Sequence, residues 1–177
     1  FDTNMIEDLT ANHPELFEKL DIKTAANEHS LEMEFPLLKY IFKEKKFLLV
    51  PIMVGHVGFG TCGQIAEALR PYNVEGTLFV ISSDFCHWGD RFHYTYLPDV
   101  PGPVYKQIEK LDRDATEQIA TGDPSKFEHY LDETRNTICG RFPILIMMHL
   151  IKGMHASFPH YSHSSDITSK DDSCVSY

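Results

Sequence analysis

Two continuous apolar runs constrain the fold more than any other feature of this chain. Residues 47–54 and 77–82 are largely apolar, and the first run is bounded by charged residues and Gly55. Such runs are typical of strands that are buried on both faces of a sheet. Segments with apolar residues at helical spacing, such as 31–42 and 104–119, alternate with these runs. We therefore expect an α/β fold, a sandwich in which a mostly buried mixed sheet is flanked by helices.

Length and charge bound the class of protein. A chain of 177 residues, 42% of them hydrophobic, is long enough to bury a core, so we expect a single domain over residues 1–177. Sixteen basic residues against 26 acidic ones give a net charge of -10. This charge disfavours binding to nucleic acid and to anionic membranes. The apolar runs are too short to cross a bilayer, so we expect no membrane insertion.

The cysteine count indicates the redox setting of the protein. The chain has four cysteines, none of them in a Cys-x-x-Cys pair. This number is too small for a disulfide scaffold in a chain of this length, and the spacing does not match a zinc ribbon. We therefore expect a reducing environment, and cytoplasmic localisation.

The loop at residues 82–89 follows the second apolar run and concentrates reactive side chains. In open α/β sheets, ligands bind beyond the carboxyl ends of the strands, which is where this loop falls. Asp84 and His87, three residues apart, can work as a general acid/base and its orienting carboxylate. They can also join the shell of a metal. The alternative is a capped turn, in which Asp84 accepts hydrogen bonds from backbone N–H groups.

A second candidate loop, residues 136–141, precedes a helix whose first turn contains Pro143. Cys139 lies near the expected start of this helix and beside Arg141. A cysteine in that position can act as a nucleophile or as a soft metal ligand. The alternative is a small buried hydrophobic residue.

A third candidate lies at residues 27–32, where a helix is expected to begin. Glu28, His29 and Glu32 can project toward one pocket. The alternative is ordinary helix-start chemistry, because acidic side chains are favoured near the N-terminal end of a helix.

Taken together, these segments resemble motifs of the Memo family (mediator of receptor-driven cell motility), and of its eukaryotic branch. The similarity covers essentially the whole chain, and the motifs occur in the family's order. They are residues 28–33 (EHSLEM) with Pro36, residues 82–92 (SSDFCHWGDRF) continuing to Tyr94–Tyr96, residues 136–141 (NTICGR) and residues 172–177 (DSCVSY).

The resemblance implies a fold similar to the class III extradiol dioxygenases and a pocket for an iron or copper ion. It identifies Cys139 as a metal ligand and places His87, with Asp84 beside it, at the acid/base position. It makes His29 a pocket residue, and we group Glu32 and Arg141 with it. The family's two metal-binding histidines match no segment of this chain and are expected upstream of Phe1. A further apolar strand is expected after Tyr177.

The resemblance leaves two classes of function open. One is a metal-dependent protein of redox-linked signalling and cell motility, as a non-haem oxidoreductase similar to the dioxygenases. Ligation by a thiolate favours Cu(I) or thiol redox chemistry over ring opening. The other is a non-catalytic binding module that recognises signalling proteins, such as phosphotyrosine segments of receptor tails, with Arg141, His29 and His87 facing the anionic group.

Overall fold

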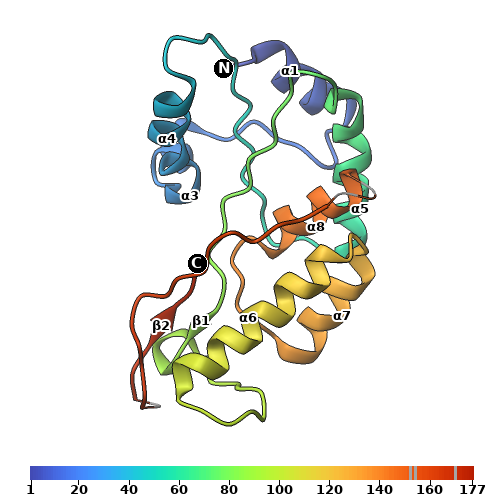
Figure 1. Cartoon of the computed structure of the whole chain (residues 1–177). Coiled ribbons are helices and arrows are strands. Elements are labelled where there is room, and N and C mark those ends of the chain that lie inside the picture. Colours follow the sequence, from blue (N-terminus) through green and yellow to red (C-terminus); the bar gives the residue numbers. More distant parts are fainter. Residues whose placement is uncertain (152, 154, 170) are drawn as a thin grey trace.

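The computed structural model describes residues 1–151, 153, 155–169 and 171–177, except for the side chains of residues 22 and 26, and is mainly helical (Figure 1). The N-terminal part holds four short helices. They are α1 (Thr3–Asn12), α2 (Ile22–Ala26), α3 (His29–Glu32) and α4 (Glu34–Phe42). The remaining elements are α5 (Phe59–Leu69), the 3-10 helix η1 (Arg70–Tyr72), β1 (His87–Trp88), the 3-10 helix η2 (Asp90–Phe92), α6 (Val104–Ala120), α7 (Pro124–Thr134), α8 (Arg141–Leu150) and β2 (Cys174–Val175).

The core of the protein lies between helices α5, α6, α7 and α8. In Figure 1, α5 packs against α8, and α7 contacts both α6 and α8. The side chains that meet there are fully buried, among them Phe127 of α7 and Leu145 of α8. Arg70 at the end of α5 donates to the carbonyls of His149 and Leu150, which holds the C-terminal end of α8 against η1. These helices form the rigid base on which the candidate loops rest.

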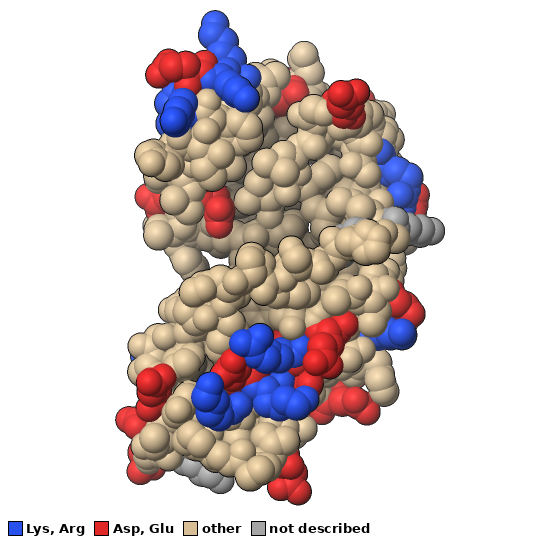
Figure 2. All heavy atoms as spheres, viewed as in Figure 1, with Lys and Arg blue, Asp and Glu red and all other residues tan. Residues whose placement is uncertain are grey.

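Helix α6 shows why the predicted helices form where the sequence places them. Its apolar residues recur at helical spacing and are buried, whereas its outer face carries ion pairs. Glu109 accepts from both Lys106 and Arg113, and Figure 2 shows blue and red side chains gathered over this helix. Amphipathic spacing of this kind specifies a helix from local sequence alone. The helix predicted at 104–119 is therefore confirmed.

The two buried strands predicted at residues 47–54 and 77–82 are wrong as strands for this chain. Both segments are extended, but neither is paired: in the described part of the chain, no N–H group of residues 48–54 or 78–82 donates a hydrogen bond. Leu48 and Leu78 are 68% and 66% exposed. A strand requires a neighbouring backbone that both donates and accepts hydrogen bonds. In the described part of the chain, one backbone N–H group donates to these segments, that of Asp2 to the carbonyl of Leu49. The sandwich therefore stays a prediction.

The sheet within the described residues is small and antiparallel. Strand β1 pairs with β2 so that His87 faces Val175 and Trp88 faces Cys174. The pairing extends beyond the strands, since the N–H of Phe85 donates to the carbonyl of Ser176 at 2.8 Å. This pairing fixes the loop that carries Asp84 and His87. The fold is thus a mixed one, with many helices and one short sheet.

Among the described residues, two cavities bear on the candidate residues. The larger, of about 920 Å³, is mainly apolar and lies among the N-terminal helices and residues 50–57. The smaller, of about 340 Å³, lies where the start of α5 meets the ends of α7 and the loop before α8. None of the helices in the described ranges has both the length and the apolar character that crossing a membrane requires.

Candidate functional site

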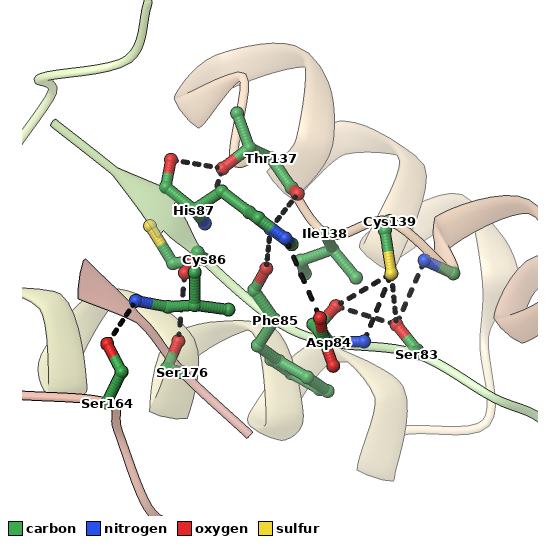
Figure 3. Close-up of polar contacts among 12 residues, drawn as sticks. Ser83, Asp84, Phe85, Cys86, His87, Thr137, Ile138, Cys139, Ser164 and Ser176 are labelled. Atoms are coloured by element: carbon green, nitrogen blue, oxygen red, sulfur yellow. Dashed lines mark hydrogen bonds and ion pairs between the residues drawn. The ribbon is translucent and has the colours of Figure 1, made fainter. Parts of the chain in front are cut away.

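The loops at residues 82–89 and 136–141, far apart in the sequence, are joined by direct hydrogen bonds (Figure 3). The N–H of His87 donates to Oγ1 of Thr137 at 2.8 Å, and this hydroxyl donates to the carbonyl of His87 at 2.9 Å. The N–H of Cys139 donates to the carbonyl of Asp84 at 3.2 Å. The predicted candidates Asp84, His87 and Cys139 are therefore brought together.

Cys139 presents its thiol at the surface. Its Sγ accepts the N–H of Asp84 at 3.1 Å and lies 3.9 Å from Oγ of Ser83. The cysteine comes directly before Gly140, which is the N-cap residue of α8. Cys62, Cys86 and Cys174 are buried, so among the described cysteines Cys139 is the exposed one. A soft ligand or a reagent thus reaches this sulfur first.

Gly140 explains how the two loops approach so closely. A Cβ at this position would lie 2.3 Å from Cβ of Ser83 and 2.9 Å from the carbonyl oxygen of Ser82. Because glycine has no side chain, its N–H can instead donate to Oγ of Ser83 at 2.9 Å. The close contact places the cysteine against the Asp84 loop.

The ring of His87 is held in one orientation. Its Nδ1 lies 3.1 Å from the carbonyl of Phe85 and 3.2 Å from that of Thr137. Both partners are acceptors, so Nδ1 carries a proton. Nε2 then faces Asp84, whose Oδ2 is 3.7 Å away. This distance is too long for a direct hydrogen bond but suits an ion pair when the ring is charged, so Nε2 is the atom that can take up or release a proton.

Arg141 lies beside the pair but faces the smaller cavity. Its guanidinium donates to the carbonyl of Ile138 at 3.1 Å and lies 4.7 Å from the ring centre of Phe142. Arg135 and His56 line the same cavity, together with the start of α5. Helix α5 has no side-chain cap and no acidic residue in its first turn. Asp132 also lines this cavity and is paired with Arg135 at 3.6 Å, which leaves the guanidinium of Arg141 as the cation there with no carboxylate partner among the described residues.

His29 and Glu32 lie in the N-terminal part of the molecule, on α3. Glu28 is the N-cap residue of this helix and accepts from the hydroxyl of Ser30 at 2.6 Å and from its N–H at 2.8 Å. These two hydrogen bonds lower the pKa of Glu28. Glu32 lines the larger cavity, and His29 is exposed. No contact within the described ranges joins either residue to Cys139. Their role in a shared pocket stays a prediction.

The residues present do not by themselves complete a metal site. Among the described residues, no group of three or more His, Cys, Asp or Glu side chains is arranged to hold a metal ion. Protein metal sites use three or four ligands, and Cys139 supplies one soft donor. Any metal centre that uses Cys139 needs donors beyond those that this structure brings to it.

Sequence reasoning missed one residue that contacts both loops. Asp112 is completely buried on α6 and accepts hydrogen bonds from Cys86 and Asn136. The signal was available, because Asp112 falls on the same helical face as Ile108 and Ala115. A carboxylate at a position whose spacing calls for an apolar side chain points to a buried polar contact.

The geometry defines a mainly helical protein in which two distant loops are joined beside an exposed cysteine. Comparison of its sequence with known proteins gives the family. The family model described as Memo-like protein matches residues 1–177. The chain therefore belongs to the Memo family, which confirms the resemblance that the loop motifs suggested.

Curated relatives agree with this assignment. The chain is 37% identical to "Protein MEMO1" of Rattus norvegicus and 38% identical to that of Xenopus laevis, in each case over 172 residues and 92% of this chain. It is 38% identical to "Protein memo-1 homolog" of Caenorhabditis elegans over 91% of this chain. The matched region is 58% of the length of the first two relatives and 49% of the third. The chain thus spans about half to three fifths of these relatives.

Proposed function

We propose that this Memo-family chain contributes Cys139 to an iron or copper pocket, in a cytoplasmic protein of redox-linked signalling and cell motility. The observation that carries the proposal is the exposed Sγ of Cys139, held against the loop of Asp84 and His87. In this proposal His87 holds or moves a proton at Nε2, and Asp84 stabilises the charged ring. A bound metal would supply Lewis acidity or electron transfer. The sandwich similar to the class III extradiol dioxygenases is the fold that we propose for the whole protein.

The test compares metal content in the protein as its source organism makes it. We expect Cys139→Ser to lose most of the bound iron or copper, measured by elemental analysis, because a hydroxyl is a poor ligand for soft metals. Cys62→Ala is the matched control, since Cys62 is fully buried between α5 and its neighbours. Unchanged metal content in Cys139→Ser would refute the proposal.

The smaller cavity favours a second candidate function, recognition of a phosphotyrosine segment of a signalling partner. Arg141 and His56 line this cavity beside the uncapped start of α5, together with the ion pair of Arg135 and Asp132. Arginine side chains and helix N-termini are the usual partners of phosphate groups in proteins. With a net charge of -10, the attraction has to be local to this cavity.

A peptide titration tests the second function. We expect a tyrosine-phosphorylated peptide to bind more tightly than its unphosphorylated form, and Arg141→Gln to remove the difference. Arg113→Gln, on the outer face of α6, changes the charge equally at a site remote from the cavity. Equal binding of both peptides, or equal effects of both variants, would exclude this role for Arg141.

A further inference from the structure

Helix α6 buries a carboxylate among apolar side chains. Asp112 has no exposed surface, and its neighbours on the same face, Ile108, Leu111 and Ala115, belong to the core. Burial raises the pKa of the Asp112 carboxyl, because the charged form loses its water. A group of this kind is destabilising unless its oxygen atoms receive hydrogen bonds.

Both oxygens of Asp112 receive such hydrogen bonds, and from three separate segments. The N–H of Cys86 and the amide of Asn136 donate to Oδ1, at 3.3 Å and 3.1 Å. The hydroxyls of Tyr161 and Ser176 donate to Oδ2. One side chain on α6 therefore joins the loop at 82–89, the loop at 136–141 and the C-terminal segment.

The donors from the two loops are adjacent in sequence to the candidate site. Cys86 precedes His87, and Asn136 precedes Thr137. His87 and Thr137 are in turn hydrogen-bonded to each other at 2.8 Å, and Cys139 binds the backbone of Asp84. A shift of either donor from Asp112 thus moves His87 or Cys139 relative to the other.

We propose that Asp112 is the positioning residue of the site, holding the His87 loop and the Cys139 loop in register through Oδ1, while Oδ2 anchors it to the C-terminal segment. The assignment of the site as a metal pocket rests on the function proposed above, but the positioning itself does not. Asp112 touches no reacting group; it acts through the backbone and side chain of its two loop donors.

The test measures the metal affinity of the protein and the alkylation rate of Cys139 in variants of Asp112. Asp112→Asn keeps the size of the side chain but replaces one carboxylate oxygen, which accepts hydrogen bonds, with an NH2 group, which can only donate. This NH2 group would then face the hydrogen-bond donors that Asp112 binds. We expect metal affinity to fall about tenfold or more, the usual loss when an outer partner of a ligand is changed. We also expect the rate at which iodoacetamide alkylates Cys139 to change. Mass spectrometry assigns this reaction to Cys139, because the other three cysteines are buried.

Ile119→Ala is the control, since Ile119 is buried on the same face of α6 but is remote from both loops. It is compared with Asp112→Asn at temperatures where both variants are equally far below their melting points. Equal alkylation rates and equal metal affinities in the two variants would overturn the proposal. If Asp112→Asn does not fold, Asn136→Ala removes the donor that the loop at 136–141 supplies to Oδ1 and is expected to shift the alkylation rate in the same assay. A wild-type rate in Asn136→Ala would then overturn the proposal.

The outcomes also separate this inference from the proposed function. If the wild-type protein carries no metal and Asp112→Asn still alters the alkylation rate of Cys139, the result supports positioning and contradicts the metal pocket. If Cys139→Ser loses the metal while Asp112→Asn keeps the wild-type metal affinity and alkylation rate, the result supports the metal pocket and contradicts positioning.

Discussion

Two regions of this molecule both carry large apolar side chains but differ in how far they bury them. Helices α5 to α8, which we call the helical core, bury Phe127 and Leu145 completely. The extended segments, residues 47–54 and 77–82, leave Leu48 and Leu78 two thirds exposed. The helices satisfy their backbone groups internally, whereas an extended segment depends on a neighbour for every hydrogen bond. Apolar composition therefore predicts burial only where the backbone can also be satisfied.

The largest expected difference between the helical core and the extended segments is in the rate of amide hydrogen exchange. Amides of α6 are inside a buried helix, whereas no N–H group of residues 48–54 or 78–82 has a hydrogen-bond acceptor in the described part of the chain. We expect exchange in the extended segments to be faster by about a thousandfold or more, since core amides open only with most of the unfolding free energy. Comparable protection in both regions would contradict the difference.

Core truncation is the next largest effect. We expect Phe127→Ala to lower the free energy of unfolding by about 3–5 kcal/mol, because it leaves a cavity in the core. Leu48→Ala, at a side chain that is 68% exposed, is expected to change it by less than about 0.5 kcal/mol. Chemical denaturation of both variants gives the two values. A loss at Leu48 as large as that at Phe127 would show that the extended segment is buried in solution.

Two glycines allow the same contrast with one chemical change. Gly140→Ala places a Cβ against Ser83 and is expected to cost about 1–3 kcal/mol and to alter the alkylation of Cys139. Gly55, just after the first extended segment, has no atom within 4 Å of an added Cβ. We expect Gly55→Ala to be neutral or stabilising by up to about 1 kcal/mol. Thermal unfolding measures the stability of both variants. Equal changes in stability would contradict the close approach of the two loops at Gly140.

The smallest effect concerns the outer face of the helical core. Hydrogen bonds from Lys106 and Arg113 lower the pKa of Glu109 below its ordinary 4.5. A lowered pKa gives stability that is present above about pH 4.5 and is lost as the pH falls through the folded-state pKa. We expect Glu109→Gln to cost about 0.3–0.5 kcal/mol at neutral pH, and less in acid. Glu117→Gln, on the same helix, is the control; equal pH dependence in both variants would contradict the assignment.

Much of the helical core could be predicted from local sequence. The apolar spacing of α6 and the Asp123–Pro124 start of α7 specify these helices without reference to the rest of the chain. The extended segments could not be predicted in this way, because a buried strand and an unpaired one have the same composition. Only the position of neighbouring backbone distinguishes them.

The candidate site was predictable in its residues but not in its geometry. Asp84, His87 and Cys139 were found from their loops and from the family motifs, and the structure places them together. The orientation of the His87 ring depends on the carbonyl of Thr137, which is 50 positions away. The importance of Asp112 depends on donors from three segments, which no local pattern reveals.

The sequence by itself determined the family, the helices of the core and the candidate residues of two loops, because these follow from motifs and local periodicity. The tertiary structure alone decided that Cys139 lies against Asp84, that Arg141 faces a separate cavity, and that a buried carboxylate joins the loops. The physical reason is that these contacts join residues distant in the chain. Such contacts exist only once helix packing has brought the distant segments together.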